Sequence, residues 1–303
     1  MLREIKTVHI IGLGAVGATY GSILYNYDKN CVKVIVDPDR LPKYKEGIII
    51  NKKRYYFDLQ VPKDGDPEAE LIIIAVKGRD LNEAIQTISP IVGNNTIILS
   101  LLNGITSEDT LSRAFGRDKV LHSFCVALDS VRENDEIIFS KSGKIVFGEY
   151  YPEVKGKAEP VARLFLKAGI NHSISGDILK EIWWKFMMNV GINQTSAILR
   201  SSYGDYASIP EAQKLLYSVC REVIPLAEKE GISLSDADID EYIKIFKGLA
   251  PDGKTSMLQD IEAGRKTEVE SFALEVINLG KKHNIPTPLN EMLYLMIRVL
   301  EQK

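Results

Sequence analysis

The sequence predicts an α/β protein, in which a doubly wound parallel sheet with helices on both faces is followed by an all-helical C-terminal domain. In the first half, short apolar runs alternate with amphipathic stretches of helical spacing, which is typical of a parallel sheet covered by helices. After Gly176 every long apolar pattern is helical and no convincing strand remains. We therefore expect a sheet domain over residues 1–175 and a helical domain over residues 176–303.

Five apolar runs are the expected strands of the parallel sheet, because each is short and bounded by Gly, Asp, Asn or Lys. They are Thr7 to Ile11, Val32 to Val36, Leu71 to Val76, Thr96 to Leu101 and Val120 to Phe124. Helical spacing covers residues 15–27, 80–91 and 157–168. Short alternating segments at 137–139 and 144–147 predict antiparallel strands at the sheet edge, and a brief strand is expected at 170–174.

The second domain is expected to contain five long helices, with Gly or Pro between most of them. Their patterns run over Asp177 to Ser201, Glu211 to Gly231, Ser235 to Phe246, Ser256 to Asn284 and Thr287 to Leu300. The boundary near residue 175 carries no obvious flexible linker. We therefore expect two closely packed domains with a cleft between them.

The composition excludes several classes of function. The chain of 303 residues has a net charge of −3, which gives no global attraction to nucleic acid or to anionic membranes. No uninterrupted apolar run reaches the ~20 residues that a membrane span requires. Three distant cysteines and four histidines without metal-ligand spacing predict neither disulfides nor a metal site, and only His122 stays a candidate, at a strand end. We expect a cytoplasmic protein that binds small molecules.

A glycine-rich turn joins the first predicted strand to the first predicted helix. It reads Gly12, Leu13, Gly14, Ala15, Val16 and Gly17. In this context G-x-G-x-x-G is the Rossmann dinucleotide fingerprint: Gly12 permits the tight turn, Gly14 lets the backbone approach a pyrophosphate, and Gly17 lets the helix pack on the strand. The helix N-terminus then presents amide groups to the anion. We expect all six residues to bind the cofactor; FAD, another nucleotide or a turn without ligand are the alternatives.

Asp37 ends the second predicted strand, 20 residues beyond Gly17, where an acidic side chain accepts hydrogen bonds from the adenosine ribose. Its carboxylate would repel a 2′-phosphate, which favours NAD(H) over NADP(H). Arg40, three residues later, could compensate with its guanidinium if the loop turned inward. Both residues are candidate cofactor ligands, and the form of the cofactor stays open.

Two further candidates are expected at the carboxyl edge of the sheet, where ligands bind in doubly wound folds. Lys77 directly follows a predicted strand and could reach a phosphate or ribose, although a solvated lysine at a strand end is equally common. Asn103, followed by Gly104, stands after the next strand and offers a donor and an acceptor to the nicotinamide and the substrate. The alternative for Asn103 is an ordinary Asn-Gly turn.

One expected helix of the second domain carries polar side chains among tryptophans and methionines. Lys185, Asn189 and Asn193 recur every four residues and so lie along one face. Burying an ammonium and two amides is costly unless they meet partners, so a cleft or a polar ligand is the favoured interpretation. A solvated polar ridge beside a core face is the alternative.

The sequence resembles the ketopantoate reductase (2-dehydropantoate 2-reductase) family over almost its whole length. The stretches that carry the resemblance are Gly12 to Gly17, Val76-Lys77, Asn103-Gly104, Trp184-Lys185 with Asn189 and Asn193, and Ser256 to Ile261 continuing through Gly264 to Glu268. The resemblance implies reduction of the 2-keto acid ketopantoate to pantoate, for pantothenate and coenzyme A. It also implies NADPH as the usual cofactor, and it raises a homodimer as an expectation.

The resemblance implies roles for residues of the second domain. Lys185 is the general acid, which protonates the alkoxide formed when hydride reaches C2 of a 2-keto acid. Glu268 is its orienting partner, although the sequence alone would place Glu268 in a charge-rich helix as a solvated carboxylate. The residue matching Ser256 contacts the substrate carboxylate, while those matching Asn189 and Asn193 hold its hydroxyl and other polar groups. By itself Ser256 could equally be a helix N-cap.

Three departures from the family pattern bear on the cofactor and the substrate. Asp37 stands where an arginine usually binds the 2′-phosphate of NADPH, Gly253 replaces a frequent asparagine, and Ala273-Leu274 stand where Asn-Gly is common. A related 2-keto acid of similar size is therefore an alternative substrate.

Two rival functions remain. A β-hydroxyacid dehydrogenase also places a lysine and an asparagine four apart on a helix, but the segment from Ser256 to Glu268 favours the reductase. A noncatalytic dinucleotide sensor would keep the fold without the chemistry, and the joint presence of Lys185, Ser256 and Glu268 argues against it.

Overall fold

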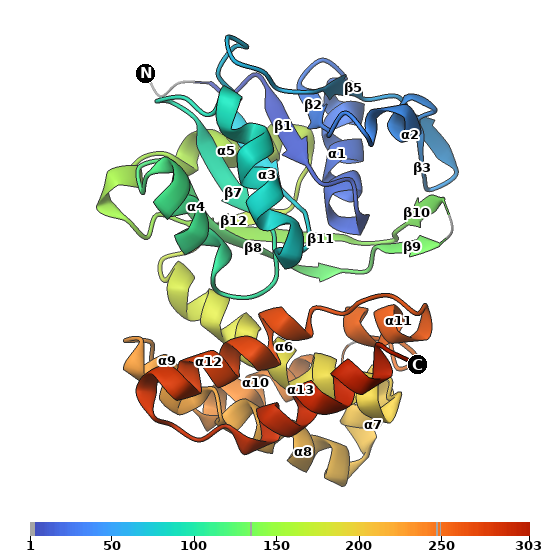
Figure 1. Cartoon of the computed structure of the whole chain (residues 1–303), viewed down its shortest axis with the longest axis vertical. Helices are drawn as coiled ribbons and strands as arrows, with labels where there is room; N and C mark the ends of the chain where they lie inside the picture. Colours follow the sequence, from blue (N-terminus) through green and yellow to red (C-terminus); the bar gives the residue numbers. More distant parts are fainter. Residues whose placement is uncertain (1–3, 134, 247, 249) are drawn as a thin grey trace. The chain divides into compact units, whose positions relative to one another are not determined.

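The computed structural model describes residues 4–133, 135–246, 248 and 250–303. They form two compact units, which divide between Ile178 and Leu179 near the start of a long helix. The first unit contains two sheets, and in the described part of the second unit every regular element is a helix (Figure 1). The predicted fold class, a Rossmann-type sheet followed by a helical region, is confirmed.

The first unit is built on an eight-stranded mixed sheet in the order β12-β11-β8-β7-β6-β1-β2-β5. Its strands are β1 (Val8–Ile11), β2 (Val32–Ile35), β5 (Asp58–Gln60), β6 (Leu71–Ile74), β7 (Ile97–Ser100), β8 (Val120–Leu128), β11 (Ser142–Gly148) and β12 (His172–Ile174). Neighbouring strands from β5 to β8 are parallel, which gives this part the 3-2-1-4-5-6 order of a Rossmann fold. The order reverses beside β1, so ligands are expected at the carboxyl ends of β1 and β6.

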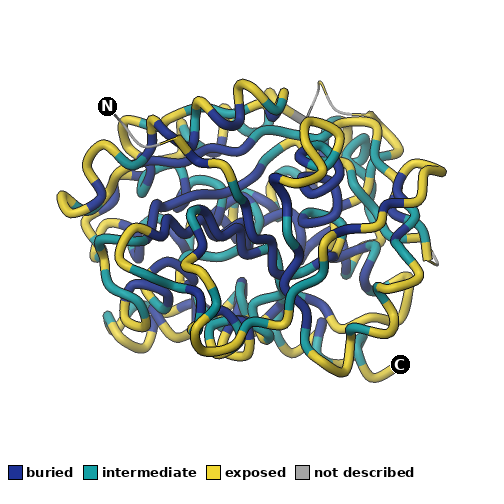
Figure 2. The backbone as a smooth tube through the Cα atoms, turned by 90° about the horizontal axis from the view of Figure 1, so that it is seen from above, coloured by how far each residue is buried: buried dark blue, intermediate teal, exposed yellow. Residues whose placement is uncertain are grey.

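Helices cover both faces of this sheet. They are α1 (Ala15–Tyr27), α2 (Leu41–Lys45), α3 (Leu81–Ile88), α4 (Ser107–Phe115) and α5 (Ala158–Ala168), with 3-10 turns η1 (Gly78–Asp80), η2 (Ser89–Ile91) and η3 (Pro152–Val154). Successive strand residues face opposite apolar cores: Ile10 packs in the core that includes α1 and α5, and Ile11 in the core that includes α3 and α4. The central strands β1, β6 and β7 are therefore buried on both faces, in keeping with the dark blue interior in Figure 2, and this explains their continuous apolar runs.

A smaller four-stranded sheet, in the order β4-β3-β10-β9, was not predicted. Its strands are β3 (Ile48–Ile50), β4 (Lys53–Tyr55), β9 (Val131–Glu133) and β10 (Glu136–Ile138). The expectation that the segment at 137–139 joins the edge of the main sheet is wrong, because β10 pairs in parallel with β3. The segment at 144–147 does join the main sheet, as β11, antiparallel to β8. Strands of three residues are too short for an alternating pattern to identify, and only long-range pairing defines them.

The second unit consists of helices of very different lengths. They are α6 (Ile178–Leu199), α7 (Tyr203–Ser208), α8 (Pro210–Arg221), α9 (Ile224–Lys229), α10 (Asp236–Phe246), α11 (Ser256–Glu262), α12 (Ala273–His283) and α13 (Pro288–Leu300), with a 3-10 turn η4 (Val269–Ser271). The single helix expected over 211–231 is broken in two. Pro225 cannot donate to the carbonyl of Arg221 and its ring crowds that carbonyl, so α8 ends there.

The single helix expected from Ser256 to Asn284 is also wrong. α11 ends in a Schellman motif, in which the amide of Arg265 donates to the carbonyl of Asp260 at 2.8 Å and that of Gly264 to Ile261 at 3.1 Å. Gly264 takes the left-handed conformation that this motif requires, with φ +63°. The chain then runs through a loop at 263–268 before η4 and α12, so Glu268 does not lie inside a helix.

Helix α6 is buried along most of its length. Trp183, Phe186 and Met187 are among its core residues, and the partly buried Trp184 donates its indole N–H to the carbonyl of Asp238 at 3.0 Å. The polar side chain of Gln194 is also fully buried and donates to Asn290 Oδ1 at 3.0 Å. The Gln194 side-chain NH₂ group thus has a partner inside the unit, as burial requires.

Candidate functional site

The glycine-rich turn between β1 and α1 is held by close backbone contacts. Gly12 has φ +96°, and a Cβ atom on it would lie 2.6 Å from the carbonyl carbon and oxygen of Ala75, just beyond β6. A Cβ atom on Gly17 would lie 1.9 Å from the carbonyl oxygen of Gly12. Both positions therefore require glycine for the fold itself, in agreement with the roles expected from the sequence.

Gly14 differs from the other two glycines of the turn. It is the N-cap of α1 with φ −76°, a conformation open to any residue, and a Cβ atom there would meet nothing within 4 Å. The first turn of α1 carries no acidic residue, and no described side chain caps it. The folded chain thus leaves open space in front of the helix N-terminus, which fits the pyrophosphate of a dinucleotide.

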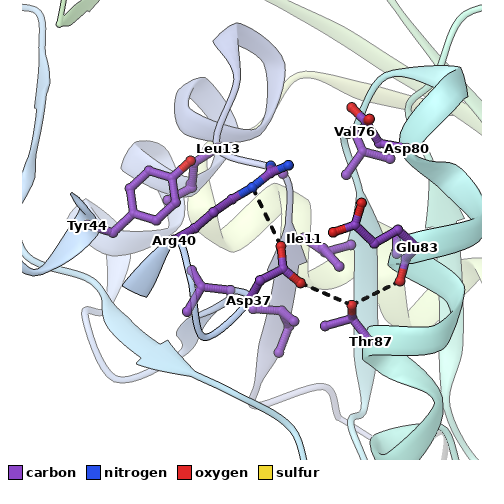
Figure 3. Close-up of a pocket in the computed structure, with 13 residues that line it drawn as sticks. Ile11, Leu13, Asp37, Arg40, Tyr44, Val76, Asp80, Glu83 and Thr87 are labelled. Carbon is purple, nitrogen blue, oxygen red and sulfur yellow. Dashed lines mark hydrogen bonds and ion pairs between the residues drawn. The ribbon is translucent and has the colours of Figure 1, made fainter. Parts of the chain in front are cut away.

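Beside this turn lies a pocket at the carboxyl ends of β1 and β2, shown in Figure 3. Gly12, Leu13, Asp37 and Arg40 all line it, so the structure brings these four predicted residues together. Lys77 and Asn103 are not among the lining residues; they follow β6 and β7 at the same edge of the sheet and are half-buried.

Asp37 is oriented by two neighbours in the pocket. The Thr87 hydroxyl lies 3.4 Å from its Oδ1, and Nε of Arg40 lies 3.6 Å from its Oδ2 (Figure 3). The same hydroxyl is only 2.9 Å from the carbonyl of Glu83, so its proton is directed mainly there. The Asp37 carboxylate therefore keeps capacity to accept hydrogen bonds from a ribose.

The pocket also contains residues that the sequence did not single out. Asp80, Glu83, Thr87 and Tyr44 line it together with Asp37. Three carboxylates, those of Asp37, Asp80 and Glu83, thus line the same pocket as Arg40, whose side chain is 56% exposed and forms only a loose ion pair with Asp37. The spacing of Asp80, Glu83 and Thr87 places them on one face at the start of α3. That this face approaches Asp37 at the end of β2 could not be predicted, because the tertiary fold decides it.

A buried hydrogen-bond chain anchors the loop that carries Asn103. The Leu102 amide donates to Ser100 Oγ at 3.4 Å, Ser100 and Ser107 hydroxyls lie 2.8 Å apart, and Ser107 donates to Glu108 Oε2 at 2.8 Å. Burial raises the pKa of Glu108 to about 7. This burial was not predictable from the sequence, because an acid in the first turn of a helix usually complements the helix dipole in solvent.

In the second unit, the predicted polar residues of α6 differ in burial. Lys185 and Asn189 are half-buried and Asn193 is buried. One turn beyond Asn193, the hydroxyls of Ser196 and Thr255 lie 2.7 Å apart, which joins α6 to the start of α11. The structure thereby brings Thr255, the residue before Ser256, against the C-terminal part of α6.

Ser256 is not the N-cap of α11. That role belongs to Thr255, whose Oγ1 accepts the amide of Leu258 at 3.2 Å, while Ser256 is exposed. Glu268 lies at the end of the loop at 263–268, directly before η4, and is half-buried. The expectation of a solvated carboxylate in a helix is therefore wrong.

His122 is an unsuitable acid or base at neutral pH. It is buried against Tyr150 and Tyr151, with ring centroids 4.9 and 5.2 Å away, and burial lowers its pKa to about 4. Among the residues that the structure describes, no group of three His, Cys, Asp or Glu could hold a metal ion, and no helix is long and apolar enough to cross a membrane. All three cysteines are buried, and none of them forms a disulfide bond.

Comparison with known families gives two matches that follow one another along the chain. The family model for "Ketopantoate reductase PanE/ApbA" matches residues 8–152. The model for "Ketopantoate reductase PanE/ApbA C terminal" matches residues 177–301. Together they span both units.

Individual relatives are similar over nearly their whole length. The 2-dehydropantoate 2-reductase of Aquifex aeolicus is 29% identical over 303 residues, covering 96% of each chain. A ternary structure of D-mandelate dehydrogenase with NADH and anilino(oxo)acetate has a TM-score of 0.89 at 23% identity, covering 98% of each chain. A dimeric ketopantoate reductase from Staphylococcus aureus has a TM-score of 0.80 at 22% identity, covering 98% of this chain and 99% of its own.

The contrast between Gly14 and Gly17 predicts that the same substitution weakens cofactor binding at one position and lowers thermal stability at the other. Gly14→Ala should bind NADH at least roughly tenfold more weakly, because the methyl group occupies the approach to the pyrophosphate, while the melting temperature changes by only about 2 °C. Gly17→Ala should instead unfold at a clearly lower temperature, because its methyl group meets the Gly12 carbonyl. Calorimetry and NADH fluorescence titration measure both effects. Unchanged NADH affinity in Gly14→Ala would contradict the assignment.

Proposed function

This chain belongs to the ketopantoate reductase family, and we propose that it reduces ketopantoate (2-dehydropantoate) to pantoate, in the supply of pantothenate and coenzyme A. As a member of that family it is an NAD(P)-dependent oxidoreductase. The observation that carries the proposal is the polar set of the second unit, in which Lys185, Asn189 and Asn193 share one face of α6 and Thr255, the residue before Ser256, contacts the same helix.

The proposed chemistry needs a proton donor at the substrate carbonyl. The reduced nicotinamide, when bound, supplies a hydride to C2 of the keto acid. The carbonyl oxygen then becomes an alkoxide, which the Lys185 ammonium stabilises by its charge and protonates. Glu268 orients the Lys185 side chain, and the neutral amine that remains is reprotonated from solvent before the next turnover.

The remaining polar residues bind the substrate. The exposed Ser256 hydroxyl donates to the substrate carboxylate, and the amides of Asn189 and Asn193 hold its hydroxyl and carbonyl groups. Asn103 contributes at the nicotinamide side, where the hydrogen-bond chain ending on Glu108 holds its loop. Lys77 contributes a cation for phosphate or ribose.

We propose NADH as the favoured cofactor, with NADPH as the alternative. The carboxylates of Asp37, Asp80 and Glu83 line the pocket beside the fingerprint, and each would repel a 2′-phosphate. Arg40 carries a positive charge that would attract the phosphate, but its ion pair with Asp37 reduces this attraction. The presence of NADH in the similar D-mandelate dehydrogenase structure supports the same choice.

A bulkier 2-keto acid is the second candidate substrate. Tyr203 packs over Gly253, so that a Cβ atom on Gly253 would lie 2.6 Å from Tyr203 Cδ2. The asparagine frequent in the family therefore cannot stand at this position without moving Tyr203. The similarity in fold to D-mandelate dehydrogenase supports testing an aromatic keto acid.

We also propose a homodimer in the cytoplasm that acts on small molecules and not on nucleic acid or membranes. The dimeric S. aureus relative supports the homodimer, and three cysteines outside any disulfide bond fit a reducing compartment. The net charge of −3 offers no general attraction to polyanions.

A panel of carbonyl substrates tests the proposed reaction. With NADH in excess, kcat/KM should be highest for ketopantoate, by roughly tenfold over phenylglyoxylate, since a few contacts worth ~1.4 kcal/mol decide the choice. A preference for phenylglyoxylate would favour the second candidate. Oxidation of a 3-hydroxy acid in a separate assay with NAD⁺ in excess would favour a β-hydroxyacid dehydrogenase, and no turnover with any compound in either direction would favour a dinucleotide sensor.

Lys185→Ala should slow turnover of the preferred keto acid by roughly 10² to 10⁴, the usual effect of losing a positioned acid. NADH affinity should stay within about twofold, because the fingerprint is untouched. Lys180→Ala is the matched control: Lys180 lies on the same helix, 44% exposed and 3.8 Å from Asp238. Near-normal turnover in Lys185→Ala would remove this residue from the mechanism.

Asp37→Arg should raise the ratio of kcat/KM with NADPH to kcat/KM with NADH by roughly 10-fold or more, because a guanidinium replaces a carboxylate at the ribose. Asp39→Arg makes the same charge change two residues away, at an exposed position that does not line the pocket, and should leave the ratio unchanged. Equal ratios in both variants would show that Asp37 does not face the ribose.

A further inference from the structure

The loop at 263–268, which ends at Glu268, is held by hydrogen bonds to Glu301 at the C-terminal end of α13. Thr267, the residue before Glu268, is buried and donates both its amide and its hydroxyl to Glu301 Oε1, each at 2.7 Å. The Thr267 hydroxyl also accepts the amide of Val269 at 3.2 Å. The backbone on both sides of Glu268 is thus tied to one carboxylate that follows α13.

Glu301 lies at a position where the helix dipole disfavours a negative charge. It is the C-cap of α13, at the negative end of the helix dipole. Its side chain is only 5% exposed, and Oε2 accepts from Arg298 Nη1 at 2.8 Å. A buried carboxylate at a helix C-terminus is unfavourable by itself, so its partners Thr267 and Arg298 account for its placement.

The other end of α13 is fixed to the helix that carries Lys185. Glu222 accepts the amides of Leu289 and Asn290 at 2.8 and 3.0 Å, and the Asn290 side chain at 2.8 Å. Asn290 Oδ1 in turn accepts from Gln194 of α6 at 3.0 Å. Hydrogen bonds therefore join the first turn of α13 to α6, and the residue that caps its C-terminus to the loop that ends at Glu268.

We propose that Glu301 is a positioning residue, which sets the location of the Glu268 carboxylate through its two hydrogen bonds with Thr267. The inference rests on the proposed function, in which Glu268 orients Lys185. A displacement of the order of 1 Å at a reacting group can cost roughly 10²-fold in rate, so loss of this anchor should be visible in kcat.

Glu301→Gln tests the inference, because the amide keeps the size of the side chain but removes its charge and presents an NH₂ group to Arg298 or Thr267. We expect kcat to fall roughly 10-fold to 100-fold while the dissociation constant of NADH is unchanged. Hydrogen exchange of the amides at 264–269 should become faster, which reports on the loop independently of activity. Thr267→Val should reproduce the loss in kcat and Thr267→Ser should largely restore it, because only serine keeps the hydroxyl.

Glu270→Gln is the matched control. Glu270 also approaches Arg298, at 3.7 Å, but it is 59% exposed and lies two residues beyond Glu268. Its substitution removes the same charge next to the same arginine without touching the Thr267 contact. We expect its kcat and its exchange rates to stay within about twofold of the unsubstituted chain.

A double substitution separates positioning from general stability. If Glu301 acts through Glu268, Glu301→Gln should cause no further loss of kcat in a Glu268→Gln background. A full additional loss there, or an unchanged kcat for Glu301→Gln in an active enzyme, would overturn the inference and leave the proposed function intact. Failure of the unsubstituted chain to reduce any 2-keto acid would instead overturn the proposed function, and the inference with it.

Discussion

The close contact between Gly17 and the carbonyl of Gly12 is the constraint on which the glycine-rich turn between β1 and α1 depends. Because neither position tolerates a Cβ atom, α1 packs directly on the end of β1 and the turn lies against Ala75 after β6. The amides of the first turn of α1 then face the edge where the strand order reverses. Gly14, which the fold does not require, is thereby left at the open side of the turn.

Three carboxyl groups, two of them buried and one half-buried, fix other parts of the chain by accepting hydrogen bonds from a loop or from a helix N-terminus. Glu108 terminates the chain of hydroxyls below the Asn103 loop, Glu222 holds the first turn of α13, and Glu301 holds the residue before Glu268. A buried carboxyl group is tolerated only with hydrogen-bond partners, whether it is charged or neutral. Loops that carry polar groups toward a ligand are in this way as well defined as the helices.

The main sheet and its covering helices were predictable from particular patterns. Strands such as Leu71–Ile74 are buried on both faces and read as continuous apolar runs. The short strands Ile48–Ile50 and Asp58–Gln60 were not predictable, because three residues carry no period and their partners lie far away in the sequence. The breaks near Pro225 and Gly264 had local signals, which the apolar periodicity on either side of them concealed.

By itself, the sequence determined the fold class and the glycine-rich turn, and it put forward Lys185, Asn189 and Asn193 as candidates through their spacing, whereas Ser256 and Glu268 became candidates only through the family resemblance. Only the tertiary structure decided that Asp80 and Glu83 join Asp37 in one pocket, that Thr255 caps α11, and that Glu301 holds the loop of Glu268. The physical reason is that hydrogen bonds and charge interactions act over a few ångströms in space, whatever the separation of the residues along the chain.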